Sequence, residues 1–595
     1  MCGFLVLQVK HHISFWMFIF IYILLYFTFF MKTHNKKFET LEEYENFIQS
    51  NNYVKPNVSY IVKNDEVIYS PDNDRYLTFI AIEPNSSIKM TKIVTGSSFT
   101  IDDANLEYST NYGVTWQSYS LDTVINLSNI GDSVKFRGTN TTFCTGYIDA
   151  NDRAHHRFEM TGKLKCKGDI TSLINSEGGN VALTGEYTFL RLFEYCSSLV
   201  NTPDFPSTTL ANHCYRLMFL NCSSLVEISE LPATTLNEYC YLGMYRLCSS
   251  LAYACELPAT TMKTYCYSYM FSGTAITTAP ILRSTSLATY CYYRIFYQCH
   301  ELVNPPALPA TTLVAFCYAG MFEECTSLKT LVSLNATTMK ESCYNTMFAG
   351  CTSLETTPEL PSTYLATSCY QGMFKNCINI KTAAKLPNCS CAGSCYREMF
   401  RGCTSLIECP SDLSTTALAS TCYYYMFYGC TSLVTVPNTL PATTIQNYAY
   451  GYMFGLCTSL INAPNISGTS LAGTHNCYMM FYGCTLLQHC PELAPTTLTN
   501  YCYESMFEGC ISITNSPELK AATLTTKSYY RMFYGCSNLV NVTCLATSIS
   551  ASNCLYQWMS GTPNTSACIF YKNASMSSWP RTVSGIPSKW TVEDY

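Results

Sequence analysis

The sequence predicts an elongated repeat solenoid, an α/β array of short parallel strands with helical or 3₁₀ returns, preceded by a small β-sandwich. The main observation is a pattern, Thr-Thr-Leu-x-x-x-Cys-Tyr-x-x-Met-Phe-x-Gly-Cys-Thr-Ser-Leu, that recurs every 25 to 27 residues. Its Met-Phe step, or the nearest equivalent, occurs 15 times between Leu192 and Trp558. A period this strict predicts units that each cover the apolar face of the next.

Each unit predicts a strand, a turn and a return. Cys-Thr-Ser-Leu-x-x-x-Pro-x-Leu-Pro-Ala-Thr-Thr-Leu indicates a short strand and a turn, and Leu-x-x-x-Cys-Tyr-x-x-Met-Phe indicates a helical or 3₁₀ return. Proline recurs four residues after the strand-opening apolar residue, as at Pro306, Pro437 and Pro517. Because proline donates no hydrogen bond, we expect each strand to end at this column. The tyrosine after the first cysteine predicts an aromatic ladder with its hydroxyl groups at the rim.

The 35 cysteines fall mostly into two columns of the repeat, one before the recurrent tyrosine and one after Met-Phe-x-Gly. The first column also accepts Ala449 and Ser528, and the second accepts Thr274 and Thr562. Thiols that are replaced so easily are small buried fillers. We expect reduced thiol ladders, although coils about 4.8 Å apart would also permit disulfides between neighbours. The expected ladder residues include Cys222, Cys325, Cys351, Cys403, Cys430, Tyr318, Tyr344, Tyr370, Phe348, Phe374 and Phe400.

Residues 55–175 predict a β-sandwich-like domain, because short β-rich runs alternate with turn residues. The expected strands are Leu77–Ile82, Ile88–Val94, Leu106–Ser109, Val114–Ser118 and Ser133–Arg137. Ser109 to Trp116 resembles the Asp-box, with Asn111 in place of the aspartate. That motif is a hairpin device in which the Asx side chain and Gly113 hold a tight turn. No carboxylate pair surrounds it, which disfavours a glycosidase.

The N-terminal residues are a poor guide to location. Ile13 to Phe30 is nearly all apolar and long enough for a marginal membrane span. The lysines that follow it would leave the repeats in the cytoplasm by the positive-inside rule. Residues 1–30 are therefore a hydrophobic segment that is either a membrane anchor or a misassigned start before Met31, with an atypical signal as a third alternative. Residues 31–54 predict a short amphipathic helix and leader.

The repeat resembles the BspA-type leucine-rich repeat in its leucine strand, its Leu-Pro turn and its Phe-x-x-Cys closure, here Met-Phe-x-Gly-Cys. The resemblance implies a leucine-rich-repeat solenoid over residues 176–562. The tail at 563–595 is similar to the C-terminal cap that closes such arrays. The resemblance also implies a bacterial surface protein, or a phage or prophage structural protein, at the cell surface, outside the cell or on a virion. A cytoplasmic location stays open if Met31 is the start.

Composition and motifs exclude several classes of function. The net charge of -6 and the absence of a basic cluster disfavour nucleic-acid binding. None of the nine histidines lies in a metalloprotease or triad pattern, and no phosphate-binding glycine loop is present. Cys389, Cys391 and Cys395 crowd one unit, but a fourth zinc ligand would have to come from a neighbouring coil, so loop variation is the simpler interpretation. We expect no enzymatic activity, no cofactor and no metal site.

The sequence favours a recognition or adhesion protein whose partner is a cell-surface protein or glycan, with membrane contact only through residues 13–30. A structural spacer is the alternative, and a carbohydrate-active enzyme is a distant third. The residues just after Ser-Leu vary most between units, which favours ligand binding. The expected ligand-facing surface is an acidic column made of Asp204, Glu230, Glu256, Glu359, Glu492 and Glu518. Such carboxylates form either a solvated turn or a directional acidic stripe.

Overall fold

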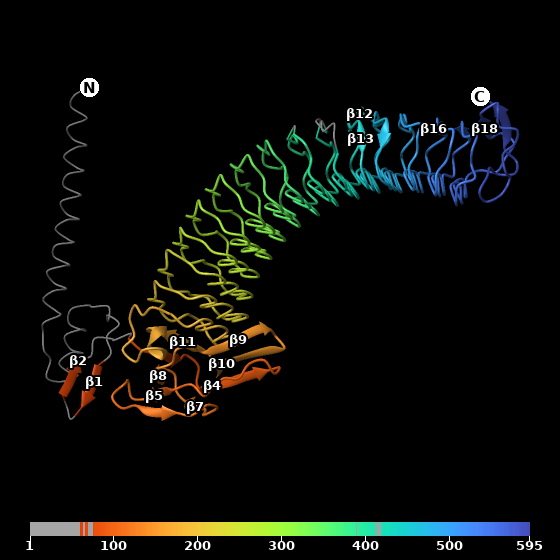
Figure 1. The fold of residues 1–595 in the computed structure, drawn as a ribbon. Coiled ribbons are helices and arrows are strands. Elements are labelled where there is room, and N and C mark those ends of the chain that lie inside the picture. Colours follow the sequence, from red (N-terminus) through yellow and green to blue (C-terminus); the bar gives the residue numbers. More distant parts are fainter. Residues whose placement is uncertain (1–59, 64–65, 70–74, 388, 411–412, 414–417) are drawn as a thin grey trace, which may run out of the picture. The chain divides into compact units, whose positions relative to one another are not determined.

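The computed structural model describes residues 60–63, 66–69, 75–387, 389–410, 413 and 418–595 (Figure 1). The smaller of its two units, Met1–Asp74, contains strand β1 (Tyr60–Lys63), which pairs antiparallel with β2 (Glu66–Tyr69). The apolar segment at 13–30 and the amphipathic helix predicted at 31–54 lie outside the described residues. In the part of the chain that is described, no helix has the length and apolar character needed to cross a bilayer.

The larger unit, Arg75–Tyr595, begins with two antiparallel sheets that face each other. One has the order β7-β4-β10-β9 and the other has the order β11-β3-β8-β5-β6. The strands are β3 (Leu77–Ala81), β4 (Ser86–Thr95), β5 (Leu106–Ser109), β6 (Gln117–Tyr119), β7 (Ile125–Leu127), β8 (Ser133–Gly138), β9 (Cys144–Asp149), β10 (Asp152–Thr161) and β11 (Leu164–Lys167). The rings of Phe79 and Phe136 lie 5.3 and 5.4 Å from that of Phe158 in the opposite sheet. This region is therefore a small two-sheet sandwich.

The β5–β6 hairpin has the turn that the Asp-box-like sequence predicts. The backbone N–H of Thr115 donates to Asn111 Oδ1 at 3.0 Å, and the N–H of Gly113 donates to Ser109 Oγ at 2.9 Å. Gly113 has a φ of 89°, which favours glycine. Strands β7, β9, β10 and β11 have no counterpart among the predicted strands. The sequence of β10, DRAHHRFEMT, shows the reason, because charged and imidazole side chains conceal its alternation.

The sandwich and the solenoid share one hydrophobic core. Phe158 stacks on Phe193 with ring centroids 5.3 Å apart, and Phe193 stacks on Phe219 of the next coil at 5.2 Å. Leu164 of β11 forms a parallel bridge with Leu199 in the first coil. The buried 3₁₀ helix η1 (Ile170–Leu173) lies between the two parts of the chain. The sandwich therefore covers the apolar end of the solenoid, which an open array would expose to water.

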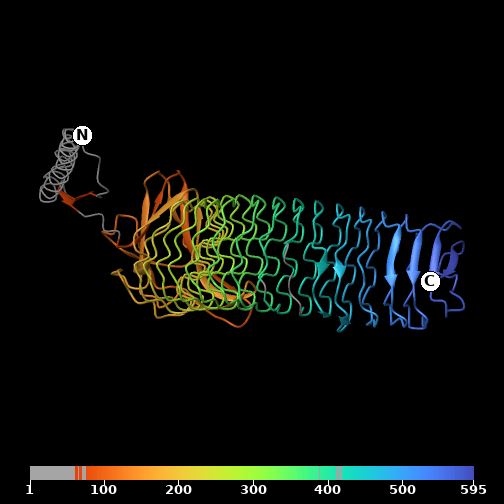
Figure 2. The same ribbon diagram turned by 90° about the horizontal axis from the view of Figure 1, so that it is seen from above.

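The coils stack through short parallel strands and isolated parallel bridges (Figure 2). The strands are β12 (Thr439–Leu440), β13 (Thr444–Ile445), β14 (Asn465–Ile466), β15 (Ser470–Leu471), β16 (Asn515–Leu519), β17 (Asn541–Cys544), β18 (Ile569–Lys572) and β19 (Thr591–Asp594). Contrary to expectation, β16 continues through Pro517, where its register to β17 shifts between Asn515 and Glu518. Proline is tolerated there because β16 is the edge of the β16-β17-β18-β19 sheet.

The returns between strands are not helical, which corrects the predicted α/β character. Along residues 316–325, every second N–H donates to the next coil and the others close turns within the coil. The N–H of Tyr318 donates to the carbonyl of Cys343 at 3.1 Å, whereas the N–H of Met321 donates to the carbonyl of Tyr318 at 3.2 Å. An α-helix uses each N–H for the carbonyl four residues back, so the two arrangements exclude each other. We call this stretch of each coil the turn ribbon.

Left-handed backbone positions recur every four residues along the turn ribbon. In one coil φ is 56° at Phe316, 61° at Gly320 and 63° at Glu324. The glycine of Met-Phe-x-Gly occupies the third of these positions in many coils, as at Gly350 with a φ of 74°. Glycine adopts this conformation without steric cost. The recurrent glycine therefore marks a left-handed turn of the ribbon.

Aromatic residues close the C-terminal end of the core. Trp558 stacks on Trp579 with centroids 6.0 Å apart, and Phe570 lies 4.7 Å from Trp579. Trp590 is buried, and its Nε1 donates to the carbonyl of Pro563 at 2.6 Å. Strands β18 and β19 extend the parallel sheet beyond the last full coil. Residues 563–595 thus cover the last apolar coil of the array.

Candidate functional site: an aromatic pocket on the turn ribbon

The two predicted aromatic ladders lie inside the solenoid. Their predicted members are Tyr318, Tyr344 and Tyr370 in one ladder, and Phe348, Phe374 and Phe400 in the other. Neighbouring rings are 6.0 Å apart in the tyrosine ladder and 5.6 to 5.7 Å apart in the phenylalanine ladder. The tyrosine hydroxyls do not lie at a rim, because the whole side chains are buried and that of Tyr370 bonds to Ser362 Oγ. Both ladders stabilise the array and offer no surface to a ligand.

The second cysteine column is a ladder of thiol hydrogen bonds. Its members include Cys222, Cys325, Cys351, Cys403 and Cys430, all fully buried. Each thiol donates to the carbonyl oxygen of a phenylalanine in the preceding coil, at 3.0 to 3.1 Å. Burial raises the pKa of such thiols, to about 12 for Cys377 in the same column, which keeps the proton on the donor. These residues therefore join neighbouring coils as well as filling space.

The acidic column has many contacts within the protein. Its members Asp204, Glu230, Glu256, Glu359 and Glu492 are exposed, and Glu518 is partly buried. Glu256 forms an ion pair with Arg283 at 3.0 Å. Glu230 Oε2 accepts a hydrogen bond from the N–H of Glu256 at 3.2 Å, and Asp204 Oδ1 accepts one from Ser229 Oγ at 3.3 Å. The column lines no described pocket, and its role in ligand binding stays a prediction.

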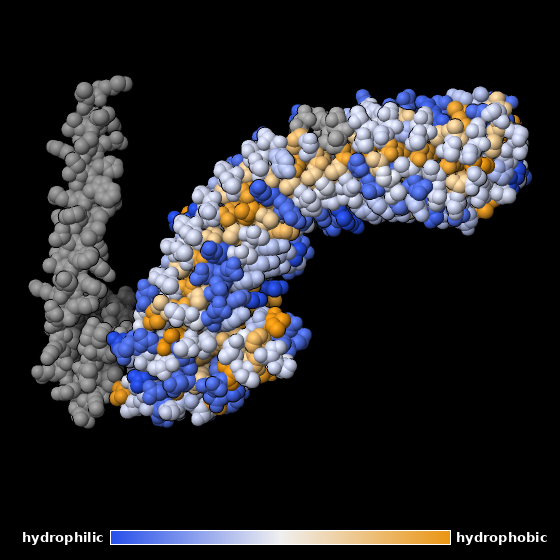
Figure 3. Space-filling view, viewed as in Figure 1, coloured by the Kyte–Doolittle hydropathy of each residue, from blue (hydrophilic) through white to orange (hydrophobic). Residues whose placement is uncertain are grey.

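The variable position after Ser-Leu forms an apolar stripe. Ile407, Val434 and Ile461 occupy it in three consecutive coils, with exposures of 49, 44 and 41%. Figure 3 shows apolar residues in a band along the array. Scattered exposed aliphatic side chains are normal on a protein surface. None of these three residues lines the pocket described below.

A third aromatic series lies on the outside of the turn ribbon. It is not among the predicted ladder residues. It occupies the residue just before the first cysteine column, and we call it the outer column. Its members are Tyr187, His213, Tyr239, Tyr265, Tyr290, Phe316, Ser342, Ser368, Ser394, Thr421, Tyr448, His475, Tyr501, Lys527 and Asn553. Each of them has a φ between 50° and 61°. The first six rings stack at 4.4 to 5.0 Å, and the run then gives way to four hydroxyl residues.

The coils lie closest together along the outer column. Tyr448 and Tyr501 each stack on His475 with ring centroids 4.4 Å apart, which is shorter than any spacing in the two buried ladders. The distance between neighbouring coils therefore increases from the turn ribbon toward the strands. Figure 1 shows the turn ribbon along the inner side of the curved array. Outer-column rings consequently pack face to face, leaving ring edges and polar groups on the surface.

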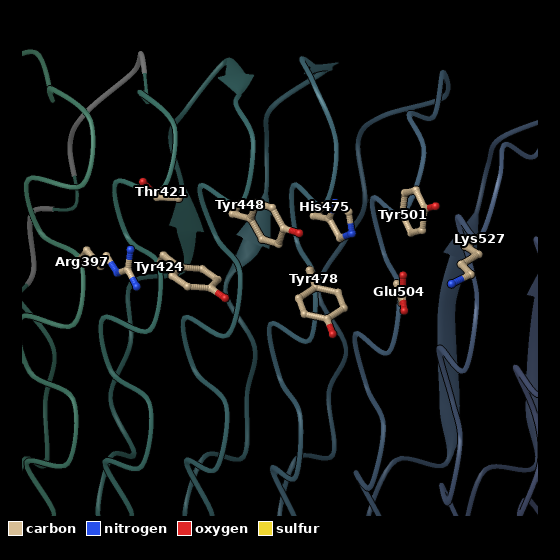
Figure 4. A pocket seen from close by; sticks show the side chains of 9 residues that line it. All are labelled: Arg397, Thr421, Tyr424, Tyr448, His475, Tyr478, Tyr501, Glu504 and Lys527. Carbon is tan, nitrogen blue, oxygen red and sulfur yellow. The ribbon is translucent and has the colours of Figure 1, made fainter.

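A pocket of about 470 Å³ borders the second aromatic run of the outer column (Figure 4). Its lining consists of Arg397, Thr421, Tyr424, Tyr448, His475, Tyr478, Tyr501, Glu504 and Lys527. The stacked rings of Tyr448, His475 and Tyr501 form one wall. Tyr424 is turned 77° from Tyr448, and Tyr478 is turned 80° from His475. The lining thus combines ring edges, ring faces and hydroxyl groups from several coils.

A glycine positions the Tyr424 ring in the pocket lining. Tyr424, Gly451 and Tyr478 occupy the same position in three successive coils, two residues after the first cysteine column. A Cβ atom at Gly451 would lie 2.8 Å from Tyr424 Cδ2 and 2.9 Å from its Cε2, so the Tyr424 ring rests directly on the glycine. Any larger residue would displace that ring. Gly451 therefore makes room for the Tyr424 ring, which fills the space beside it and forms part of the pocket lining.

The same coils depart from the repeat in the core. Asn476 occupies the place of the first cysteine. The backbone carbonyl of Asn476 accepts a hydrogen bond from the N–H of Tyr450, and in a regular coil the carbonyl of Cys343 accepts the equivalent bond from the N–H of Tyr318. Asn476 is fully buried, with Nδ2 donating to the carbonyl of Ile445 at 2.6 Å and Oδ1 accepting from Thr499 Oγ1 at 2.7 Å. Its satisfied amide fixes the backbone next to the pocket residue His475.

Cationic side chains lie at both ends of the pocket. The Arg397 guanidinium is 5.3 Å from the Tyr424 ring centroid, and Lys527 Nζ is 5.3 Å from that of Tyr501, both within cation–π range. Burial and then the charge of Lys527 lower the pKa of His475, which favours the neutral imidazole near pH 7. Burial raises the pKa of Glu504 despite the opposing charge of Lys527. These ring, hydroxyl and charged groups are suited to binding a polar partner.

The sequence contained a signal for this site. Tyr424, Tyr448 and Tyr478 lie outside the repeat's own tyrosine position, and Gly451 interrupts them. The pocket residues extend from Arg397 to Lys527, and residues of neighbouring coils are 26 or 27 positions apart, so only the register of the coils brings them together.

A family model matches part of the repeat array. Residues 317–461 and 475–560 match the family model described as a BspA type leucine rich repeat region, in 6 copies. No curated protein matches the sequence. A leucine-rich repeat protein from Bacteroides ovatus aligns over 84% of this chain and all of its own, with 16% identity and a TM-score of 0.39.

Two further crystal structures are similar over part of the chain. A leucine-rich repeat protein from Eubacterium ventriosum has 12% identity and a TM-score of 0.29, covering 58% of this chain and 93% of its own. A leucine rich cell surface protein from Faecalibacterium prausnitzii has 17% identity and a TM-score of 0.24, covering 51% and 84%. Over residues 317–461 and 475–560, this chain is therefore similar to the BspA type of leucine-rich repeat.

Proposed function

We propose that this chain is a non-enzymatic recognition protein that binds a cell-surface protein or glycan through the pocket on the turn ribbon. The observation that supports the proposal is the tyrosine- and histidine-lined hollow between Arg397 and Lys527. Tyrosine and arginine are enriched where proteins bind partners, because they combine a large rigid contact area with polar groups. A bacterial adhesin and a virion-associated receptor-binding protein would both use such a surface.

The outer column argues against the alternative of a plain spacer. A spacer needs only the buried core, whose phenylalanine ladder continues with little change from coil to coil. The outer column instead changes from six aromatic residues to four hydroxyl residues and back to aromatic residues. The second aromatic run coincides with the pocket and with Gly451, against which the Tyr424 ring packs. A protein that only sets a distance would have no need for this change in the outer column.

The chain offers a matched variant for testing the pocket. Ser342, Ser368 and Ser394 show that serine is accepted in the outer column of well-packed coils. The triple variant Tyr448→Ser, His475→Ser and Tyr501→Ser therefore removes the aromatic wall while keeping a residue that the turn ribbon tolerates. Tyr253→Ala is the control, because that tyrosine is 76% exposed and lies outside the outer column.

The experiment screens the full chain and both variants on a glycan array and on a panel of cell-surface proteins. We expect the wild type and the control to bind the same probes and the triple variant to lose at least about tenfold in affinity, about 1.4 kcal/mol. Circular dichroism checks that each variant is folded. Equal binding by all three proteins would reject the pocket, and no binding by the wild type to any probe would favour a spacer.

A further inference from the structure

Three cysteines from two neighbouring coils meet in the interior of the solenoid, away from the proposed ligand pocket. The Sγ atoms of Cys391, Cys395 and Cys422 all lie within 4.8 Å of one another. Cys395 Sγ and Cys422 Sγ are 3.5 Å apart. The three residues are 8, 0 and 0% exposed. No His, Asp or Glu belongs to the group among the residues that the structure describes.

The group exists because one residue departs from the repeat. Four residues before the first cysteine column, the neighbouring coils have Leu365 and Leu418, and this coil has Cys391. The position faces the cysteine column, as two other coils show. There, the thiols of Cys266 and Cys343 each lie 3.8 Å from the Sδ atom of a methionine, Met262 and Met339 respectively. Replacing an apolar residue by cysteine at this point therefore adds a third thiol to a pair of stacked thiols.

We propose that Cys391, Cys395 and Cys422 form a binding site for one thiophilic d¹⁰ metal ion of the Zn²⁺ and Cu⁺ class. Thiolate ligands select these ions over Mg²⁺ or Ca²⁺. With a metal–sulfur distance of about 2.3 Å, the sulfur atoms of one site lie about 3.8 to 4.0 Å apart. The Cys395–Cys422 separation is 3.5 Å and no separation exceeds 4.8 Å, so binding requires only small movements of the three side chains.

The physical setting favours binding during folding. A metal ion replaces the thiol protons, and its positive charge offsets the cost of burying thiolates. Cu⁺ is satisfied by three sulfur ligands, whereas Zn²⁺ takes a fourth ligand from outside the group. Cys389, which the sequence grouped with Cys391 and Cys395, is not part of the cluster, and Cys422 of the next coil takes its place. The inference does not depend on the proposed ligand pocket.

The test uses Cys391→Leu, which restores the residue found in both neighbouring coils and so preserves packing. Cys389→Ser is the matched control in the same loop. Each full-length protein is produced in cells supplied with Zn²⁺ or with copper, purified without oxygen, and analysed for metal per chain by mass spectrometry. The Zn²⁺ and copper arms distinguish the two ions.

We expect the wild type and Cys389→Ser to hold about one more ion per chain than Cys391→Leu, with a higher melting temperature in the metal-loaded wild type. Cd²⁺ added during refolding should give a thiolate charge-transfer band that Cys391→Leu lacks. Equal metal content in wild type and Cys391→Leu would overturn the proposal. So would peptide mapping that finds Cys395 and Cys422 joined by a disulfide in the protein as purified from metal-supplied cells.

Discussion

The thiol of Cys351 donates a hydrogen bond to the backbone carbonyl oxygen of Phe322, 3.0 Å away in the preceding coil. The same carbonyl also accepts from the N–H of Cys325 in its own coil. The other cysteines of the second column repeat this arrangement, whereas Thr274, which replaces cysteine, donates its hydroxyl to the carbonyl of Phe271 in its own coil. Threonine is accepted in the column because its buried hydroxyl still finds a carbonyl acceptor.

The hydrogen-bonding role of Cys351 predicts a difference between two substitutions of equal shape. Cys351→Thr keeps a donor and Cys351→Val removes it. We expect the valine variant to be less stable than the threonine variant by about 1 kcal/mol, the usual net value of one hydrogen bond. Urea unfolding followed by circular dichroism measures the difference. If valine is as stable as threonine or more so, the column is only a packing ladder.

The buried phenylalanine ladder predicts a large loss of stability on truncation. Phe374 is fully buried and stacks on Phe348 and Phe400 at 5.7 and 5.6 Å. Phe374→Ala should lower the free energy of unfolding by about 3–5 kcal/mol, because the cavity lies between two rigid coils. Tyr364→Ala is the control, since Tyr364 is 61% exposed. An effect below about 1 kcal/mol would mean that the coils collapse into the cavity.

Acid should destabilise the junction between sandwich and solenoid. Burial lowers the pKa of His156 to about 4, whereas an unfolded histidine titrates near 6.5. Between these values the unfolded chain binds more protons, so stability falls as the pH drops from about 6.5 to 4, by up to about 3 kcal/mol. Urea unfolding at several pH values measures the slope. His156→Leu should reduce the dependence of the free energy of unfolding on pH. An unchanged slope in that variant would show that other groups cause the dependence.

A second loss of stability is expected at lower pH. Burial opposes ionisation of Glu194, but the hydrogen bond with His155 and the charge of Arg191 outweigh it and lower the pKa of Glu194 to about 2. Its contribution to stability is present above the unfolded value near 4.3 and is lost as the pH falls toward 2. The same urea series, extended to acid pH, follows this step.

The acidic column is an alternative ligand surface, and reversing its charges tests whether it binds the ligand. Glu230→Lys, Glu256→Lys and Glu359→Lys together reverse three of its charges. Because Glu256 already pairs with Arg283 and Glu230 bonds to a backbone N–H, we expect little change in binding to intact cells across a salt series. Exposed pairs of this kind contribute little energy. A salt-dependent loss of binding in the triple variant would instead assign the ligand to the column.

The repeat period predicted the solenoid and its core, because each Phe374-like position recurs with the same neighbours in every coil. It did not predict the turn ribbon. The apolar spacing of Leu-x-x-x-Cys-Tyr-x-x-Met-Phe fits a helix equally well, and the bonds that prevent one, such as Tyr318 to Cys343, join residues 25 positions apart. Only the recurrent glycine, left-handed at Gly350, indicated a turn.

The pocket could not be predicted from any single unit. It depends on Gly451, whose missing side chain matters only because Tyr424 lies against it from the preceding coil. It also depends on the stacking of His475 between two tyrosines, which requires the observed register of three coils. The outer column is visible in the sequence once units of 25 to 27 residues are aligned. The exposure of these residues could not be predicted, because the helical return expected from the sequence would have given their side chains other directions.

Hydroxyl-radical footprinting with a ligand chosen from the array screen tests the central claim most directly, because it reports the exposure of individual aromatic side chains. We predict that the ligand protects Tyr448, His475, Tyr478 and Tyr501 from oxidation and leaves Tyr253 and Tyr364 unchanged. Full oxidation of the four pocket residues in the saturated complex, with protection at the acidic column or the sandwich instead, would contradict the assignment of the turn-ribbon pocket as the binding site.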